Sequence, residues 1–321
     1  RPRSYILDTV SVEQCAKNFK EVFLGERQNA DNYKIVSCCD DRYFNAMKSF
    51  INNYKNENLN FACLTIYDLG LSRDHFVELI HIQNLYHFDI RKLDYSKYPE
   101  HVDLTKYNGL KCSYAFKPVL IYEQANMSED PVIYMDSGCG FTKNTIEYIC
   151  GEVKKNHFWI SIANNKGTIE SKELNHKDTL QHFNVDKNDI ITCSANAMGL
   201  NYSNNYCKDI IDKWYQSCLD PKIITPEKTD RNNHRQDQSV LSCVLNNSNF
   251  TNFSNAPGFQ PWKYGGIRDH QNYKCCSWKK HNASRIEGII YVNSIEEAYE
   301  ILSNRKNMTK DELLREFTII I

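Results

Sequence analysis

The sequence lacks the long apolar and long basic runs that would place a protein in a membrane or on nucleic acid. No stretch approaches about 18 consecutive apolar residues, the length of a membrane-spanning helix. The 39 Lys and Arg residues nearly balance the 40 Asp and Glu residues and form no long run. We therefore expect no nucleic-acid partner. Because the chain begins at Arg1 rather than Met, we expect membrane contact only through an anchor that has been removed.

The sequence also contains no Cys-x-x-Cys pair, although 13 cysteines is a high number for 321 residues. Cys38-Cys39 and Cys275-Cys276 are adjacent pairs, whereas structural zinc sites use ligands about two to four residues apart. We therefore expect disulfides rather than zinc. Because the total is odd, at least one thiol is expected to be free or paired outside the chain.

Sites of the form Asn-x-Ser/Thr indicate the secretory pathway, where disulfides also form. Seven such sites are a mild excess over chance, and glycan acceptors of this kind lie on surface loops of secreted proteins. We predict a location in the secretory pathway, in the Golgi lumen or outside the cell. An Asn-rich cytosolic protein from an AT-rich genome is the alternative. The sites begin at Asn126, Asn201, Asn246, Asn249, Asn252, Asn282 and Asn307.

Length and composition allow one large α/β domain or two smaller ones. The chain shows no internal repeat and no linker longer than a loop. We therefore predict one domain over residues 1–321, with parts at 33–150, 151–265 and 266–321. The last part is predicted to be a helical extension, because residues 294–317 have the pattern of two polar helices.

The first half of the chain alternates strand and helix patterns. Apolar segments that end in acidic or small residues alternate with segments whose apolar residues recur at helical spacing. This order predicts a parallel sheet with right-handed crossovers, whose ligands bind beyond the carboxyl ends of the strands. The predicted strands are 33–41, 61–72, 86–94 and 131–141, and the predicted helices are 42–55, 73–82 and 111–125.

Acidic residues stand where these predicted strands end. They are Asp40, Asp41, Asp68 and Asp136. Because the carboxyl ends of parallel strands meet at one edge of a sheet, we expect the four acids to line a crevice there. The alternative for each one is that it caps the helix or turn that follows.

The second half is less regular. Residues 157–164 and 189–200 are predicted to be strands, and residues 204–219 an amphipathic helix. Residues 234–245 start polar and become apolar, which predicts a helix with Asp237 and Gln238 in its first turn, near the positive end of the helix dipole.

Four short motifs occur in an order that resembles a known family. They are SCCDDRYF, LTIYDLGLS, VIYMDSG and QDQSVL. In this order the chain resembles nucleotide-sugar glycosyltransferases of the A-type fold over about residues 33–265. The resemblance is closest to the group of glycogenin and bacterial galactosyltransferases and to related uncharacterised families. It implies a mixed, mostly parallel central sheet flanked by helices, with a nucleotide-binding half at 33–150 and a half at 151–265 for donor sugar and acceptor.

The resemblance implies that the first half binds the nucleotide. In the family, the acid after the first strand contacts the base or ribose and a nearby aromatic residue stacks on the base, which corresponds to Asp40 and Tyr43. A basic residue before the third motif neutralises phosphate, which indicates Lys117; a solvated surface lysine is the alternative. Asp68 and Ser137, within the second and third motifs, are expected to contribute to the same nucleotide-sugar site.

Asp136 matches the first acid of the Asp-x-Asp element of the family. The second acid of that element binds Mn²⁺ or Mg²⁺, but here the position is Gly138. The family histidine before a Lys-Pro-Trp-like segment is also missing, because Ser254, Asn255 and Ala256 precede Gln260-Pro261-Trp262. We therefore expect either a weakly held ion at Asp136 or metal-free catalysis in which Lys or Arg takes over the charge. Without a metal, Asp136 would contact sugar or ribose hydroxyls.

Asp237 and Gln238 match the Asp-Gln element whose side chains reach the donor sugar in the family. The resemblance implies that Asp237 is the catalytic or sugar-orienting carboxylate and that Gln238 stabilises the oxocarbenium-like state. A general base is the second role considered for Asp237, and a helix cap is the structural alternative. Asn196 matches a position that contacts the sugar, and His234 and Arg235 are further candidates to supply charge to the diphosphate.

The sequence therefore predicts a glycosyltransferase that moves a sugar from a nucleotide sugar, most simply a UDP-sugar, to a glycan or protein acceptor. The closest family members retain the anomeric configuration. Two other hypotheses remain at this point. One is a degenerate relative that binds a nucleotide or glycan without turnover, which Gly138 supports. The other is a disulfide-bonded extracellular interaction protein that keeps only the architecture.

Overall fold

The computed structural model describes most of the chain between Tyr33 and Tyr264 and parts of the remainder. The described residues are 33–59, 61–106, 113–162, 174–229, 233–264, 274–280, 288–292, 309, 311–312 and 317–320.

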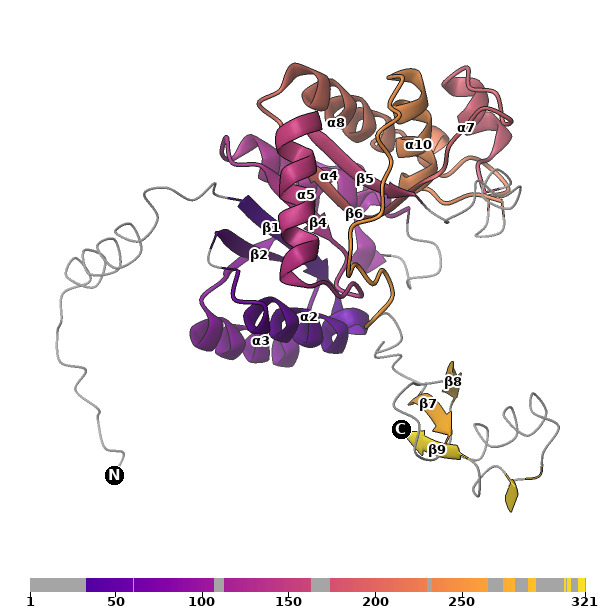
Figure 1. Ribbon diagram of the computed structural model, residues 1–321. Coiled ribbons are helices and arrows are strands. Elements are labelled where there is room, and N and C mark those ends of the chain that lie inside the picture. Colours follow the sequence, from indigo (N-terminus) through magenta and orange to yellow (C-terminus); the bar gives the residue numbers. More distant parts are fainter. Residues whose placement is uncertain are drawn as a thin grey trace, which may run out of the picture.

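A six-stranded sheet forms the centre of the molecule, with the strand order β3-β2-β1-β4-β6-β5 (Figure 1). Neighbours among β1 to β4 pair in parallel, whereas β6 pairs antiparallel with both β4 and β5. The predicted fold class, a mixed and mostly parallel sheet flanked by helices, is confirmed. The strands are β1 (Tyr33–Cys39), β2 (Ala62–Asp68), β3 (Asp89–Lys92), β4 (Val132–Met135), β5 (Phe158–Ile162) and β6 (Cys193–Leu200).

Helices cover both faces of this sheet. One hydrophobic cluster joins the sheet to α2, α3 and α5, and another joins its opposite face to α4, α8 and α10. Figure 1 shows α5 across one face, with α8 and α10 on the far side of the sheet from α2 and α3. The helices are α2 (Phe44–Asn56), α3 (Arg73–Tyr86), α4 (Phe116–Asn126), α5 (Lys143–Asn156), α7 (Lys177–His182), α8 (Asn205–Cys218), α9 (Pro221–Ile224) and α10 (Asp237–Asn247).

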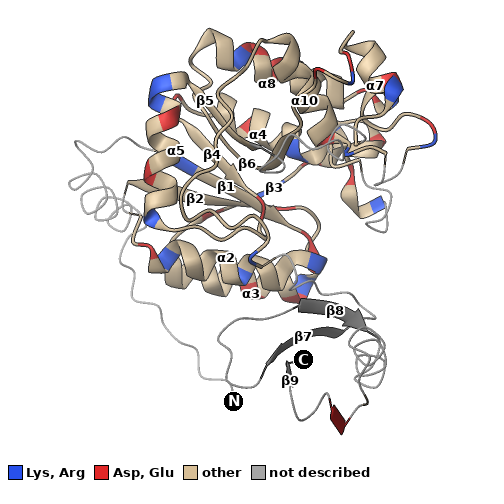
Figure 2. Cartoon of the chain, turned by 45° about the vertical axis from the view of Figure 1, so that its right-hand side comes forward, with Lys and Arg blue, Asp and Glu red and all other residues tan. Residues whose placement is uncertain are grey.

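The sequence explains this layering. The central strands β1 and β4 are buried on both sides, so they consist of nearly continuous apolar runs, as parallel strands covered by helices require. Figure 2 shows these strands mostly free of charged residues, with acidic positions where strands end. Local caps fix where the helices start: Ser72 accepts a hydrogen bond from the His75 N–H at the start of α3, and Thr142 forms a capping box with Thr145 at the start of α5.

Pro118 sits in the first turn of α4, where its missing N–H has no helical partner to lose. Short 3₁₀ turns connect the strands to the helices and shape the loops on this side of the sheet. They are Asp41–Tyr43, Tyr95–Lys97, Glu100–Val102 and Leu104–Lys106.

The C-terminal part contains strands that were not predicted from the sequence. Within residues 266–321 the structure contains a small antiparallel sheet of order β8-β7-β9. Its strands are β7 (Lys274–Lys280), β8 (Gly288–Val292) and β9 (Phe317–Ile320). The predicted helices at 294–317 lie largely outside the described residues. The strands were not predicted because strand pairing depends on partners far along the chain.

The cysteines buried in the core give no support to the expected disulfides, while Cys15 and Cys112 lie outside the described residues. Seven described cysteines are free thiols buried in the core: Cys38, Cys39, Cys139, Cys193, Cys207, Cys218 and Cys243. Burial raises the pKa of the Cys38 and Cys193 thiols to about 12, so they stay neutral and pack as small apolar groups. Within the described part of the chain, no helix is long and apolar enough to cross a membrane.

Candidate active site

A pocket opens beyond the carboxyl ends of β1 and β4, between the first turns of α4 and α10. Eight of the nine residues predicted for a nucleotide-sugar site line it, although they come from segments spread over about 200 residues of sequence. They are Asp40, Tyr43, Lys117, Asp136, Ser137, Asn196, Asp237 and Gln238. The ninth, Asp68, does not line the pocket.

Lys117 is the centre of the charge arrangement. Residue 117 lies in the first turn of α4, and its side chain is only 7% exposed. Its Nζ lies 3.1 Å from Oδ1 of Asp136 and 3.5 Å from Oδ2 of Asp237, and it donates a hydrogen bond of 2.9 Å to the Ala195 carbonyl. Burial by itself lowers the pKa of Lys117, but the carboxylates of Asp136 and Asp237 outweigh it and hold the pKa above its usual value. The alternative of a solvated surface lysine is therefore wrong.

Asp136 follows β4 and is held by groups from three elements. Its Oδ1 accepts a hydrogen bond of 2.6 Å from the Tyr134 hydroxyl and faces Lys117, and its backbone N–H donates to the Asn196 carbonyl at 2.8 Å. A charge at the end of a buried strand is tolerated here because a buried cation and a hydroxyl compensate it. Since Asp136 still lines the pocket, its carboxylate remains close to any bound ligand.

Asp237 is the first residue of α10 and is buried, with 4% of its surface exposed. Burial raises the pKa of its carboxyl to about 6, although Lys117 opposes this shift, and the charge of Asp136 adds to it. Its Oδ2 forms no hydrogen bond with any described residue. The preceding Gln236 adopts φ 42° and ψ −113°, a strained backbone for a residue with a side chain. This bend carries the chain into α10 at the pocket wall.

Asn196 carries a buried side-chain oxygen at the pocket. It lies in β6, is 5% exposed, and its Oδ1 has no hydrogen-bond partner among the described residues. A buried polar atom without a partner is unfavourable by about 1–3 kcal/mol unless something binds to it. Asn196 lines the same pocket as Asp237, and a hydroxyl group of a ligand would satisfy its Oδ1.

Asp40 both caps a turn and lines the pocket. Its carboxylate accepts hydrogen bonds from the Tyr43 backbone N–H at 3.2 Å and from Nε of Arg42 at 2.6 Å. Asp40 therefore has both roles expected of a strand-ending acid. It caps the turn, and the cap fixes Tyr43 and Arg42 at the pocket edge.

Asp68 corrects the prediction of a ligand-binding role. Its Oδ1 accepts hydrogen bonds from the backbone N–H groups of Gly70 at 2.8 Å and Leu71 at 2.7 Å, within a turn where Gly70 has φ 117°. The Oδ1 of Asp41 accepts a hydrogen bond from the Ser72 N–H and pairs with the His75 ring, each at 2.7 Å. Asp68 therefore organises its own turn, whereas Asp41 binds the start of α3 from a different part of the chain.

His234 also differs from its expected role. It is fully buried, its Nδ1 accepts a hydrogen bond from the His176 N–H at 3.3 Å, and its Nε2 donates to the Ile224 carbonyl at 2.9 Å. Burial lowers its pKa to about 4, so the ring is neutral and supplies no charge to a diphosphate. It anchors the segment that leads into α10, whereas its neighbour Arg235 does line the pocket.

The sequence reasoning did not assign several residues that line the pocket, among them Arg42, Tyr114, Phe116, Gln236 and Trp262. Arg42 lies two residues after Asp40, so its position beside a strand-ending acid was a usable signal. Trp262 was visible only as part of a family segment. The aromatic residues Tyr114 and Phe116 precede or begin α4, and nothing local distinguished them from core residues.

The side chains at this site do not fit a divalent cation. Among the described residues, no group of three or more His, Cys, Asp or Glu side chains could hold a metal ion. The Asp136 carboxylate already faces the Lys117 ammonium and the Tyr134 hydroxyl, and Gly138 brings no ligand. A second cation beside Lys117 would be repelled, while Mg²⁺ and Mn²⁺ require several oxygen ligands.

No protein-family model matches the chain, and no curated protein matches it. The chain resembles several solved structures. A galactosyltransferase, LgtC, in complex with donor and acceptor sugar analogues is 15% identical; the match covers 66% of this chain and 70% of that chain, with a TM-score of 0.40. Mouse xyloside xylosyltransferase 1 is 11% identical over 68% of this chain and 83% of that chain, with a TM-score of 0.41. GlyE of Streptococcus pneumoniae is 14% identical over 68% and 44%, with a TM-score of 0.42.

These three relatives in structure are all glycosyltransferases.

Proposed function

We propose that this protein is a glycosyltransferase that moves a sugar from a nucleotide sugar to a hydroxyl group of a glycan or protein. The observation that carries the proposal is the charge arrangement at the pocket. A buried Lys117 lies between the carboxylates of Asp136 and Asp237, and all three residues line the pocket. Such a site offers a cation to a diphosphate and acceptors to sugar hydroxyls.

In the proposed reaction the bond between the anomeric carbon and the diphosphate oxygen breaks, and a bond from that carbon to the acceptor oxygen forms. The diphosphate leaves with the electron pair of the broken bond, and the acceptor hydroxyl gives its proton to the leaving diphosphate oxygen or, in the general-base role, to the carboxylate of Asp237. Positive charge develops on the sugar ring and negative charge on the leaving oxygen, so a catalyst needs anionic and cationic groups on opposite sides of that bond. Asp237 and Lys117 are the groups proposed for these two tasks.

Asp237 is proposed to orient the donor sugar and to face the developing positive charge. Gln238, the next residue at the start of α10, is proposed to assist through its amide, and Asn196 through its buried oxygen. A general base is the second role proposed for Asp237, because its raised pKa of about 6 makes it a better proton acceptor than an ordinary aspartate. The helix-capping alternative has less support, since Asp237 is the first helical residue and Gln236 is the cap residue.

The nucleotide is proposed to bind at the end of the pocket formed by the β1 turn. Tyr43 and Tyr114 offer aromatic faces for a base, and Asp40 and Arg42 offer a paired acid and base for ribose and phosphate oxygens. Ser137 lies next to Asp136 and is proposed to contact the same diphosphate. The motif resemblance favours a uridine nucleotide.

Lys117 is proposed to supply the positive charge that a divalent cation supplies in relatives with a complete Asp-x-Asp element. The ammonium group is already in place beside Asp136, and its raised pKa keeps it charged throughout the physiological range. Transfer is therefore proposed to continue when divalent cations are removed. A test with EDTA, followed by added Mn²⁺ or Mg²⁺, distinguishes this proposal from the weakly held ion at Asp136.

The remaining features of the proposal come from the sequence. Retention of the anomeric configuration follows the motif resemblance, and the coupling constant of the anomeric proton in the product tests it. The secretory pathway is proposed from the glycosylation sites, of which Asn126, Asn249 and Asn252 are exposed. A mobility shift after treatment with an N-glycosidase tests this location. Burial of seven free thiols in the core removes disulfides from the reasons for it.

The experiment for the function itself combines binding with turnover. A thermal-shift series with UDP, GDP, CDP and ADP identifies the nucleotide, because a ligand of the folded state raises the apparent stability. Hydrolysis and transfer assays with the matching nucleotide sugars then follow, with methyl glycosides as acceptors. Absence of both binding and turnover over this panel would overturn the proposal.

A second candidate is a protein that binds a nucleotide or glycan without turnover. The observation that favours it is the replacement of the second metal-binding acid by Gly138. Binding of a nucleoside diphosphate without hydrolysis or transfer, with and without Mn²⁺, would select this candidate over the enzyme.

A further inference from the structure

Trp262 is a large apolar side chain that stays exposed at the edge of the pocket. It is 66% exposed, yet it is one of the residues that line the pocket. The other two tryptophans with described side chains, Trp159 and Trp214, are completely buried. An exposed tryptophan beside polar atoms without partners is typical of a binding surface rather than of a folding core.

The turn that carries Trp262 is fixed to the loop after β4. Gly140 and Gln260 exchange two backbone hydrogen bonds of 2.9 Å, and the Tyr264 N–H donates to the Gly138 carbonyl at 2.8 Å. The Lys263 side chain lies directly over Gly140, where a side chain on residue 140 would collide with it. The Cys139 thiol lies 3.4 Å from the Pro261 carbonyl. Trp262 is therefore presented on a rigid support next to Asp136.

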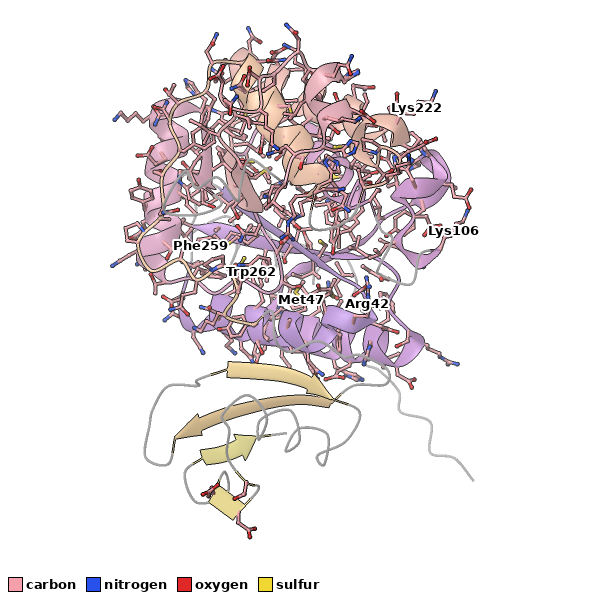
Figure 3. All side chains as sticks on the ribbon, turned by 90° about the vertical axis from the view of Figure 1, so that its right-hand side faces the viewer. Arg42, Met47, Lys106, Lys222, Phe259 and Trp262 are labelled. Atoms are coloured by element: carbon pink, nitrogen blue, oxygen red, sulfur yellow. The ribbon has the colours of Figure 1, made fainter. Side chains whose placement is uncertain are left out.

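Trp262 is separated from the end of the pocket proposed for the base. Figure 3 shows Trp262 on the side of Phe259 and apart from Arg42, which pairs with Asp40 after β1. Phe259 in turn packs edge-on against the buried Trp159. Tyr43 and Tyr114 already offer aromatic faces at the end of the pocket proposed for the nucleotide base. An aromatic face on the other side therefore fits a different part of the donor or the acceptor.

We propose that Trp262 is the platform on which the acceptor sugar stacks, so that the acceptor of this enzyme is a glycan whose ring presents an apolar C–H face. This inference rests on the proposed function and adds the chemical class of the acceptor to it. The indole covers the apolar face of the ring, and its Nε1–H group donates to a ring or hydroxyl oxygen. The acceptor hydroxyl then lies on the side of Asp237, where its proton is lost.

Two readouts test the platform. Trp262→Ala, Trp262→Phe and the wild type are titrated with methyl β-D-galactoside and methyl β-D-glucoside, in the presence of saturating UDP, while tryptophan fluorescence is recorded. The same variants are assayed for transfer to these glycosides. The matched control is Phe76→Ala, which removes an exposed aromatic side chain on α3 that does not line the pocket.

Three results are expected. The wild-type fluorescence responds to one of the glycosides and Trp262→Ala does not respond. The KM for the acceptor rises about tenfold or more in Trp262→Ala with a much smaller change in kcat, since truncation of a central aromatic anchor weakens binding by more than 1.4 kcal/mol. Trp262→Phe recovers part of that loss, and Phe76→Ala equals the wild type.

Opposite results overturn the platform in distinct ways. An unchanged acceptor KM in Trp262→Ala excludes it, and weaker UDP binding in the same variant assigns Trp262 to the nucleotide instead. If the wild type transfers no sugar, the proposed function fails, and the fluorescence titration still decides about Trp262. A response that Trp262→Ala abolishes then supports a sugar platform in a non-catalytic protein, and no response in the wild type overturns the platform.

Discussion

The turn after β2 and the turn after β4 have the same sequence pattern, but their aspartates make different contacts. Each strand ends in an aspartate followed by a short glycine-containing turn. After β2, the carboxylate of Asp68 is satisfied by two backbone N–H groups of its own turn. After β4, the carboxylate of Asp136 bonds to Tyr134 and faces Lys117, which comes from a different element. Only the second acid lines the pocket.

The difference shows what distinguishes a capping acid from a site acid. A cap forms its bonds within about three residues, so any mutation there acts on the local turn. A site acid depends on groups that the fold brings from elsewhere, so its mutation acts on the pocket and on its partners. The following four experiments test this distinction at three positions.

The largest effect is expected for Asp237→Asn. The variant keeps the size and polarity of the side chain but removes the charge that faces the donor sugar, so kcat/KM for transfer should fall by about 10²–10⁴. UDP binding, measured by calorimetry, should change little. As the control, Asp220→Asn alters the cap residue of α9 away from the pocket and should keep full activity. Full activity of Asp237→Asn would show that Asp237, like Asp68, has a structural role and no role in the reaction.

Lys117→Met should weaken both folding and binding. Two buried carboxylates, of Asp136 and Asp237, would lose their cation, which destabilises the fold by about 3–5 kcal/mol in denaturant unfolding and abolishes the affinity for UDP. Lys213→Met is the control, since Lys213 forms an exposed pair with Asp209 and should change stability by less than about 0.5 kcal/mol. Equal effects of the two lysines would contradict the central role of Lys117.

The pH dependence of stability isolates Asp237. Its pKa in the fold, about 6, lies above its ordinary value of 3.8, so the folded state holds a proton that the unfolded state has lost between these values. This stabilising contribution is complete below about pH 4 and is lost as the pH rises through 6. The free energy of unfolding of the wild type minus that of Asp237→Asn should therefore fall between about pH 4 and 7, by at most about 3 kcal/mol in total. A difference independent of pH would show that Asp237 is not buried as described.

The smallest effect is expected for Asp68→Ala. Loss of the acceptor for the Gly70 and Leu71 N–H groups should lower the free energy of unfolding by about 1–2 kcal/mol, with UDP affinity and transfer unchanged within twofold. Asp94→Ala is the matched control, because Asp94 accepts from Ser96 in an exposed turn. A large loss of UDP binding in Asp68→Ala would return Asp68 to the nucleotide site and remove the contrast with Asp136.

The sequence indicated most of the fold in the first half but less of it near the C-terminus. Strand-helix alternation over Tyr33–Asn126 predicted the parallel strands, because each apolar run and each amphipathic helix carries a local signal. The antiparallel entry of β6 beside β4 was not predicted, since pairing direction depends on where a long connection returns. For the same reason the pairing of β7, β8 and β9 was not predicted.

The sequence by itself determined which residues carry charge, where strands end in acids, and which motifs stand in order. It placed Asp40, Asp136 and Asp237 at the ends or starts of elements that share one edge of a sheet. Tertiary structure alone decided that Asp68 caps a turn, that Lys117 is buried between two carboxylates, and that Trp262 stays exposed at the pocket. The physical reason is that burial and the distance between charges set the energy of an ionised group, and both arise only when segments far apart in the chain pack together.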